Sequence, residues 1–340
     1  MRPLAVVILA AGKGTRMKSD RAKVLHEICG RPMIAYPVDT ALQLRPKKVV
    51  VVIGHQADQA RAAVTSSFPK RPIEFVLQES QDGTGHAVLQ TKKALRGFDG
   101  DVLILYGDVP LLRAHTLREF RRIHHRNGDR ISLISTEMHD PTGYGRCIFD
   151  ECDELIEVVE EKDATPAQKR ITEINAGIYL VDAKLLWRAL SRIGKSNAQK
   201  EMYLTDIVVA ARGLGESVVA CRAPDAFEVL GVNSRVELAQ ASENIRWRLV
   251  VSMMQNGATF VDPTTFYPDH DVQIGRDTII EPNVMMLGQT RVGERCRIGQ
   301  GCRLENTVIE DEAQIGPYCM LTGVAVKKGM IVERFTRRLE

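Results

Sequence analysis

The first apolar run of the chain covers residues 4–10 without a polar interruption and leads directly into Ala11-Gly12-Lys13-Gly14-Thr15-Arg16-Met17. Such a run predicts a strand that is buried on both faces, as in a parallel sheet covered by helices. The alternation continues, with strand-like runs at 49–53, 73–77 and 102–106 between helix-like segments at 32–44, 56–65 and 84–95. This order predicts βαβ units and an α/β fold with a Rossmann-like, mostly parallel sheet.

The pattern is less regular between residues 112 and 230. A basic segment at 117–125 predicts a helix, and we expect its neighbouring His124 and His125 to lie on a solvent-exposed face. A strand is predicted at 131–136, followed by a β-rich insertion.

Two further helices are predicted before the composition changes. The first is capped by Thr205 or Asp206 and runs to Ala211. The second follows the capping-box pattern at 234–237 and ends at Asn256-Gly257. We interpret this long helix as the connection between two domains.

A six-residue period begins after Gly257. Apolar residues recur at this step, with a slip of one residue before the last three, at Ile274, Ile280, Met286, Val292, Ile298, Leu304, Ile309, Ile315 and Leu321. Period six with glycines at the turns predicts a short left-handed hexapeptide β-helix, of which these nine positions cover about three coils. An ordinary meander of short strands is the alternative interpretation.

These patterns divide the chain into a first domain at 1–231, a connecting helix at 232–256 and a β-helix at 257–340. Because coils of this kind bury their faces only against neighbours, we also expect self-association.

Composition excludes several classes of protein. The chain has 340 residues and a formal net charge of +3, which is too small for a protein that binds nucleic acid or a membrane surface through basic residues. No apolar segment is long enough to span a membrane, so we expect a cytoplasmic protein. The seven cysteines are scattered, which predicts reduced thiols in or near cores rather than disulfides or a zinc site.

The glycine-rich turn after the first strand predicts a phosphate site. Gly12 and Gly14 allow a sharp bend that brings backbone N–H groups against an anion, and Lys13, Arg16, Lys18 and Lys23 add positive charge. The turn matches neither the Rossmann nor the Walker A pattern, and a glycine-rich turn without a ligand remains an alternative.

Two later strand ends carry candidate chemistry. Asp108 follows a buried strand, where its carboxylate can serve as a hard oxygen ligand for Mg²⁺ together with substrate phosphates. Gln78 follows another, and its amide matches the imide edge of uracil, while Gly83 and Thr84 at the next helix start allow close approach of a base.

Residues 9–17 and 23–25 resemble the opening signature of the sugar-1-phosphate nucleotidyltransferases. The resemblance is greatest to the uridylyltransferase part of the bifunctional enzymes that make UDP-N-acetylglucosamine. It continues through 141–146, 159–165, 173–178 and 201–206, which are similar to the sugar-binding motifs of that family.

The resemblance implies a role for each matching residue. Arg16, Lys23 and Asp108 would be catalytic, with Arg16 and Lys13 on the leaving pyrophosphate and Lys23 between the two reacting phosphates. Asp108 and Asn233 would bind Mg²⁺, although Asn233 alone reads as a loop or N-cap residue. The nucleotide would be held by Leu9, Ala10, Ala11, Gly12, Lys13, Gly14, Gln78, Gly83 and Thr84. The sugar would be held by Tyr106, Gly145, Glu160, Asn175, Tyr203 and Thr205.

The resemblance therefore implies magnesium-dependent uridylyl transfer from UTP to N-acetylglucosamine-1-phosphate, by a homotrimer formed through the β-helix. Because the family's β-helix continues for more coils, we expect no acetyltransferase activity from this chain. Three alternatives stay open: the same chemistry with dTTP or glucose-1-phosphate, a non-catalytic nucleotide-sugar-binding regulatory subunit, and an acyltransferase that uses the coils. The last needs a histidine in the repeats, whereas His270 lies before the regular coils.

Overall fold

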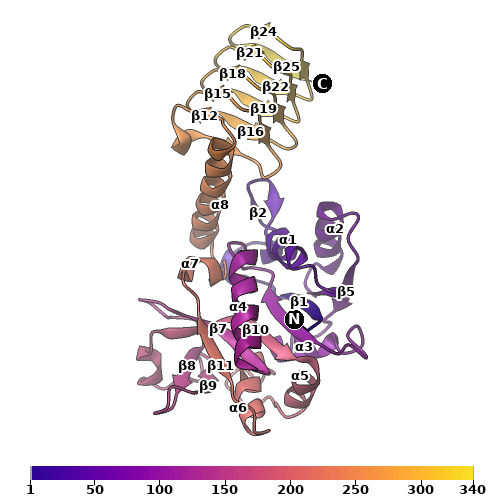
Figure 1. Cartoon of the computed structure of the whole chain (residues 1–340), viewed down its shortest axis with the longest axis vertical. Coiled ribbons are helices and arrows are strands. Elements are labelled where there is room, and N and C mark those ends of the chain that lie inside the picture. The colour runs from indigo at the N-terminus through magenta and orange to yellow at the C-terminus, as the bar shows by residue number, and fades with distance from the viewer. Residues whose placement is uncertain (1, 340) are drawn as a thin grey trace. The chain divides into compact units, whose positions relative to one another are not determined.

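A computed structural model describes residues 2–339 and divides into two units (Figure 1). The N-terminal unit contains residues up to 26 and 32–234, and the C-terminal unit contains 27–31 and residues from 235 onward. The predicted domain bounds place 27–31 in the first domain and the long helix between the two domains. In the structure both segments group with the coils.

The N-terminal unit is built on a nine-stranded sheet whose main path has the order β11-β7-β10-β6-β1-β4-β5. β1, β4, β5 and β6 are parallel, and β10 runs antiparallel to β6 and β7, so the sheet is mostly parallel as predicted. The strands are β1 (Leu4–Ala10), β4 (Lys48–Ile53), β5 (Ile73–Leu77), β6 (Asp101–Tyr106), β7 (Ile131–Glu137), β8 (Arg146–Phe149), β9 (Leu155–Val159), β10 (Glu173–Asp182) and β11 (Val219–Arg222).

Helices cover both faces of this sheet because its strands are apolar on both sides. Alternate residues of β1 enter two separate cores, with Val7 in one and Ile8 in the other. The core around Val7 includes residues of α3 (Thr84–Gln90), α5 (Ala183–Leu190) and α6 (Ile207–Arg212). The core around Ile8 includes residues of α1 (Ala35–Gln43), α2 (Ala57–Ser67) and α4 (Ala114–Asn127). Short elements complete the unit: η1 (Thr15–Met17), η2 (Lys23–Leu25), η3 (Gln168–Arg170), η4 (Leu204–Asp206) and α7 (Ala226–Val229).

Two local predictions in this unit were wrong and one was right in position only. The helix expected at 84–95 ends at Gln90 and continues as turns. Asp206 is the N-cap residue of α6, as predicted, but its side chain makes no capping bond, and the Thr205 hydroxyl donates to Glu160 instead. His124 is buried rather than solvated, since it continues the apolar stripe of α4 through Leu117 and Phe120.

The longer segment of the C-terminal unit starts with α8 (Arg235–Gln255) and continues as a parallel β-helix (Figure 1). The strands stack in three parallel sheets. One contains β12 (Thr259–Phe260), β15 (Ile279–Ile280), β18 (Arg297–Ile298), β21 (Gln314–Ile315) and β24 (Ile331–Val332). The second contains β13 (Tyr267–Pro268), β16 (Met285–Leu287), β19 (Arg303–Glu305), β22 (Met320–Thr322) and β25 (Arg337–Leu339). The third contains β14 (Gln273–Ile274), β17 (Arg291–Val292), β20 (Val308–Ile309) and β23 (Ala325–Val326). The turn η5 (Pro263–Thr265) lies in the first coil, and β2 (Glu27–Ile28) pairs with β3 (Arg31–Pro32).

The β-helix runs from β12 to β25, within the predicted bounds of 257–340, and strands at both of its ends lie outside the regular step from Ile274 to Leu321. The one-residue slip lies at a corner. Gly288, Gln289 and Thr290 separate β16 from β17, whereas only Asn306 and Thr307 separate β19 from β20. Val292 still pairs with Ile309, so the shorter corner keeps the apolar residues in register inside the stack.

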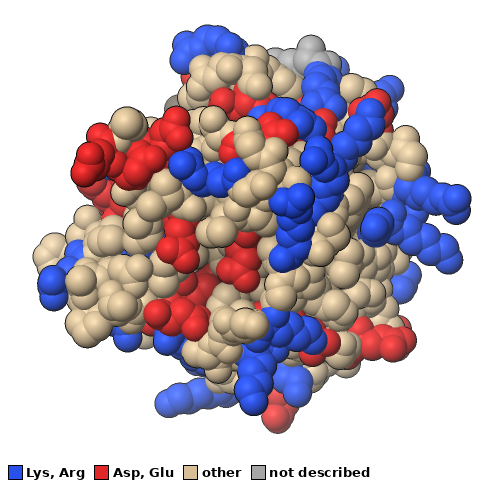
Figure 2. Space-filling model, turned by 90° about the horizontal axis from the view of Figure 1, so that it is seen from below, with Lys and Arg blue, Asp and Glu red and all other residues tan. Residues whose placement is uncertain are grey.

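Surface charge is mixed. On the face drawn in Figure 2, acidic side chains group beside a band of Lys and Arg rather than leaving a field of one sign. Among the helices of residues 2–339, none is long and apolar enough to cross a membrane.

Candidate active site

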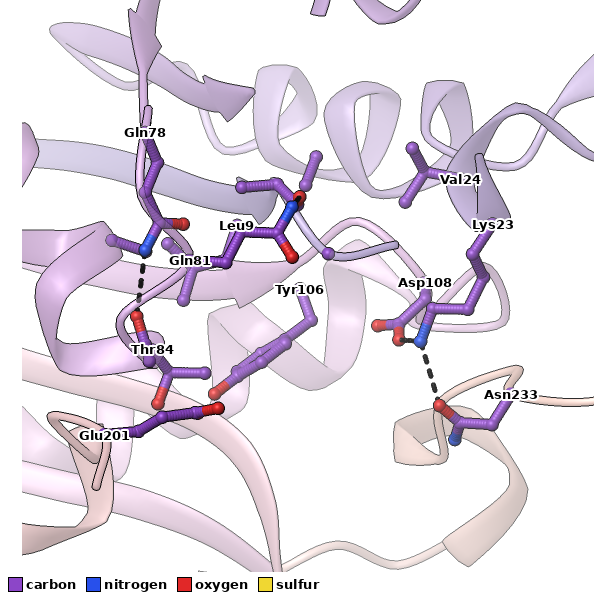
Figure 3. Close-up of a pocket in the computed structure, with 15 residues that line it drawn as sticks. Leu9, Lys23, Val24, Gln78, Gln81, Thr84, Tyr106, Asp108, Glu201 and Asn233 are labelled. Atoms are coloured by element: carbon purple, nitrogen blue, oxygen red, sulfur yellow. Dashed lines mark hydrogen bonds and ion pairs between the residues drawn. The ribbon is translucent and has the colours of Figure 1, made fainter. Parts of the chain in front are cut away.

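A cavity of about 360 Å³ lies beyond the carboxyl ends of β1, β5 and β6, where ligands of parallel sheets usually bind (Figure 3). Eleven of the predicted site residues line it: Leu9, Ala10, Ala11, Gly12, Lys23, Gln78, Gly83, Thr84, Tyr106, Asp108 and Asn233. Four other residues, not predicted from the sequence, also line it: Val24, Gln81, Ala87 and Glu201. Glu201 opens the motif at 201–206, so its position in that motif could have identified it.

The two glycines of the first turn have different roles. Gly14 adopts a left-handed conformation, with φ of 69°, and an added Cβ would lie 2.4 Å from Lys23 Cβ. Position 14 therefore requires glycine for two reasons: its left-handed φ, and the space that a side chain would take from Lys23. Gly12 has no left-handed φ, and a Cβ there would meet nothing within 4 Å. The conformational argument for Gly12 was wrong, and its missing side chain instead keeps one wall of the cavity open.

A cluster of one cation and two oxygen donors occupies one end of the cavity. Lys23, the first residue of η2, donates to Asp108 Oδ2 and, over 2.8 Å, to Asn233 Oδ1. The Asn233 amide has a defined orientation, because its Nδ2 donates to the Gly231 carbonyl over 3.0 Å. Its oxygen therefore faces the cation. The donor set of a carboxylate and an amide oxygen around a positive charge fits a hard divalent cation.

The opposite end of the cavity is formed by the loop between β5 and α3 (Figure 3). Gln78 Nε2 donates to the Gly83 carbonyl over 3.1 Å and lies 3.2 Å from His86 Nδ1. Gln81 Nε2 donates to the Ala11 carbonyl over 2.9 Å, which ties this loop to the first turn. Gly83 has φ of 104°, and a Cβ there would lie 2.5 Å from the Met202 carbonyl oxygen. The position therefore requires glycine.

A second group of predicted residues lies together without lining this cavity. Thr205 Oγ1 donates to Glu160 Oε1 over 3.1 Å, and Asn175 N donates to the Gly145 carbonyl over 2.9 Å. A Cβ on Gly145 would lie 3.6 Å from Glu160 Oε2, so these residues are neighbours. Burial raises the pKa of the Glu160 carboxyl, the Thr205 bond partly offsets this, and nearby acidic residues raise it further.

The side chain of Asn175 is held from both ends. Its Nδ2 donates to the buried Tyr179 hydroxyl over 2.8 Å, and its Oδ1 accepts from Gly177 N over 3.0 Å. Gly177 lies at a register shift of β10, and a Cβ there would lie 2.7 Å from Tyr106 Cε2. The shift therefore makes room for the Tyr106 ring.

Tyr106 and Thr84 connect the two groups. Leu204 N donates to Thr84 Oγ1 over 3.0 Å, and Thr84 is also a hydrogen-bond partner of the Tyr106 hydroxyl. Backbone bonds from Met202 N to Asp82 O and from Gly85 N to Met202 O, each of 2.8 Å, join the same segments. Tyr203 is buried beside them, and burial raises its pKa.

Four residues predicted for the phosphate site of the first turn do not line the cavity. Lys13, Arg16 and Lys18 are exposed, and Gly14 packs against the Lys23 side chain. The Arg16 guanidinium is close to the loop after β7, since Nη1 lies 3.7 Å from the position of a Cβ on Gly143.

Comparisons with known proteins agree with this two-part organisation. Residues 6–171 match the family model of the MobA-like NTP transferase domain, and residues 271–306 match that of the bacterial transferase hexapeptide (six repeats). The chain is 47% identical over 335 residues to the bifunctional protein GlmU of Anaeromyxobacter dehalogenans strain 2CP-C, covering 98% of this chain and 68% of that protein. It is 44% identical over 324 residues to the bifunctional protein GlmU of Desulfotalea psychrophila, covering 95% of this chain and 94% of that protein.

The first match covers β1, β5 and β6, whose ends form the cavity, and the second covers the coil strands from β14 to β19. The similarity to these relatives spans both regions. The chain therefore belongs to the GlmU family of nucleotidyltransferases.

Proposed function

We propose that this protein transfers the uridylyl group of UTP to N-acetylglucosamine-1-phosphate, which gives UDP-N-acetylglucosamine and pyrophosphate. A phosphate oxygen of the sugar phosphate forms a bond to the α-phosphorus, and the bond from that phosphorus to the oxygen of the departing pyrophosphate breaks. The observation that carries the proposal is the Lys23, Asp108 and Asn233 cluster in the same cavity as the loop from Gln78 to Thr84.

The chain supports this chemistry by positioning and charge. Lys23 lies at the cavity end nearest the first turn and can contact the reacting phosphates, while exposed Lys13 and Arg16 can contact the leaving pyrophosphate. Asp108 and Asn233 would hold Mg²⁺ through oxygen donors. A bound Mg²⁺ would supply charge neutralisation for the phosphates. No covalent intermediate on the protein is needed.

The orientation of Gln78 supports recognition of uracil. Its Nε2 donates to Gly83, so its Oε1 is the atom that can accept from a base. Uracil and thymine present an N–H at ring position 3, whereas cytosine presents an acceptor there. We expect UTP to be preferred to CTP, and dTTP is the nearest competing substrate.

The second group of residues supports recognition of an amino sugar. Glu160 and Asn175 combine acceptors and donors, which suits sugar hydroxyls and an acetamido group, and Tyr203 and Thr205 close the same region. Glucose-1-phosphate lacks the acetamido group and is the competing sugar substrate.

The test measures pyrophosphate released by the full chain with Mg²⁺. We expect UTP with N-acetylglucosamine-1-phosphate to give the highest kcat/KM in a panel that includes CTP, dTTP and glucose-1-phosphate. A higher value for another pair would replace the substrate and keep the reaction class. Absence of release with every pair, from protein that still binds UTP, would favour the regulatory-subunit alternative.

We also propose that these 340 residues do not transfer acetyl groups. Histidine is the commonest general base, and residues 271–340 contain none. Acetylation of glucosamine-1-phosphate from acetyl-CoA by the purified chain would contradict this proposal.

We propose a homotrimer formed through the β-helix and a cytoplasmic location. The exposed apolar side chains of the coils, such as Met285, Met320 and Ile331, support self-association. The cysteines of residues 2–339 are all free, which suits a reducing compartment. The mass of the particle in solution, measured by light scattering, tests the trimer.

A further inference from the structure

Lys23 occupies the position that the proposed function gives to a metal ion. Its ammonium contacts Asp108 Oδ2 and lies 2.8 Å from Asn233 Oδ1, the two atoms that would coordinate Mg²⁺ (Figure 3). The side chains of Lys23 and Asp108 are each only 14% exposed, so solvent screens this pair poorly. An ion on the same two oxygens would lie against the ammonium.

The two oxygens are positioned by bonds that do not involve Lys23. Val232 N donates to the Asp108 carbonyl over 2.8 Å, which fixes the segment before Asn233 beside the end of β6. The bond from Asn233 Nδ2 to the Gly231 carbonyl then turns the amide oxygen toward Asp108. The donor pair can therefore persist when the ammonium leaves.

Lys23 can leave without a change of fold. Its backbone is held in η2 by bonds from Leu25 N to Ala22 O and from His26 N to Lys23 O, while its flexible four-carbon stem carries the charge. Gly14 leaves open the space around the start of that stem. Movement of the stem alone would carry the ammonium from the carboxylate toward phosphates bound in the cavity.

We propose that the Lys23 ammonium and the divalent cation exclude each other at Asp108 and Asn233. Lys23 then blocks the metal site until the phosphates of a nucleoside triphosphate draw the ammonium away. This inference rests on the proposed function and adds an order to it. The ammonium neutralises the partly buried carboxylate in the free protein, and a divalent cation arriving alone would meet a like charge in contact. Phosphates supply the alternative partner for Lys23, so metal and nucleotide bind cooperatively.

The test measures binding of Mn²⁺ alone to the nucleotide-free full chain by electron paramagnetic resonance. Lys23→Met removes the charge and keeps the length of the stem, and we expect it to bind Mn²⁺ at least tenfold more tightly than the wild type. Lys23→Arg keeps the charge and should bind as weakly as the wild type. Lys18→Met, at an exposed residue of the same segment, controls for net charge and should change the affinity less than twofold.

Two further measurements separate the outcomes. The Lys23→Met/Asp108→Asn variant should lose the gain, which assigns the tighter ion to this site, and Mn²⁺ should raise the Tm of Lys23→Met more than that of the wild type. Equal or weaker Mn²⁺ binding by folded Lys23→Met would overturn the inference. Pyrophosphate release by the wild type is scored separately: release with unchanged Mn²⁺ affinity refutes only the exclusion, and tighter Mn²⁺ binding without release refutes only the transfer reaction.

Discussion

The β-helix is built from equivalent positions that repeat along the chain, whereas the cavity is built from residues that each occur once. In the coils the same inward position is filled repeatedly, by Ile280, Ile298 and Ile315 on one face, and each makes the same kind of contact. In the cavity each functional side chain, such as those of Lys23 and Asp108, has its own position and its own contacts. A change in a repeated position should therefore cost stability and leave chemistry intact, whereas a change in a single position should cost chemistry and leave stability intact.

The largest expected effect is that of Asp108→Asn. The amide is nearly the same size but cannot neutralise Lys23 or supply a charged metal ligand. We expect kcat to fall by about 10³-fold, or about 4 kcal/mol in transition-state stabilisation, while the Tm stays within a few degrees. Pyrophosphate release measures the first quantity and thermal unfolding the second.

The matched control is Asp99→Asn, an exposed carboxylate just before the start of β6 that pairs with Lys184. It should keep kcat within twofold. Activity of Asp108→Asn above a tenth of the wild type would contradict the role given to this carboxylate.

The next effect, on stability alone, is expected from Ile298→Ala in the middle of the coil stack. Ile298 is fully buried between Ile280 and Ile315, so truncation leaves a cavity that the neighbouring coils cannot close. The free energy of unfolding of the C-terminal unit should fall by about 3 kcal/mol, with kcat unchanged within twofold. Gln314→Ala, at an exposed position of the next coil, should cost less than about 0.5 kcal/mol in urea unfolding. A loss of kcat as large as the loss of stability would show that the two regions are coupled.

The repeated region was the easier one to predict from sequence. A six-residue period directly encodes inward positions, so the coils and their stacking register followed from Ile274 to Leu321. The strands at the ends of the stack lie within the predicted bounds but could not be assigned one by one, because Phe260 and Pro268 precede the regular step and Val326 follows another five-residue step. The inward-facing residues at the two ends of the β-helix keep the geometry of the coils but do not follow the six-residue period.

The cavity was predicted in a different way. Asp108 and Gln78 could be found because each follows an apolar run that reads as a buried strand. Asn233 and Glu160 came only from family resemblance, since nothing local distinguishes them from surface residues. The contacts of Lys23 with Asp108 and Asn233 could not be foreseen, because they join residues separated by 85 and 210 positions. His124 was wrongly predicted to be exposed because histidine is usually polar surface, whereas its position on α4 continues the buried stripe of Leu117 and Phe120.

His124 offers a smaller effect that tests whether single polar residues of the N-terminal unit can serve stability alone. It is 1% exposed, its Nδ1 lies 2.8 Å from Ser132 Oγ, and burial, helped by the charges of His125, Arg2 and Arg121, lowers its pKa to about 4. Because the folded protein binds this proton less readily than the unfolded chain, stability is present above the ordinary pKa of 6.5 and is lost as the pH falls toward 4. The expected loss between pH 7 and pH 5 is about 2 kcal/mol.

Other groups titrate in this range, including Asp206, whose pKa is raised to about 6 mainly by burial. The measurement is therefore the difference in unfolding free energy between the wild type and His124→Asn, which can keep a bond to Ser132 but cannot be protonated. That difference should shrink by about 2 kcal/mol from pH 7 to pH 5. A constant difference would show that His124 is protonated as easily in the folded protein as in the unfolded chain.

Tyr179→Phe gives the smallest expected effect and can break the division between stability and chemistry. Tyr179 is a fully buried core residue, yet its hydroxyl accepts from Asn175 Nδ2, and Asn175 is a proposed sugar ligand. Removing the hydroxyl leaves a buried amide N–H without this partner, which should cost about 1 kcal/mol of stability and let the Asn175 side chain rotate. We expect KM for N-acetylglucosamine-1-phosphate to rise about fivefold, with KM for UTP and kcat changed less than twofold. Tyr36→Phe, a buried tyrosine of α1 outside both groups of site residues, should leave both KM values unchanged. Equal changes in both KM values for Tyr179→Phe would mean that the hydroxyl supports the core in general. A change in KM for the sugar phosphate alone would mean that Tyr179 serves both stability and substrate binding.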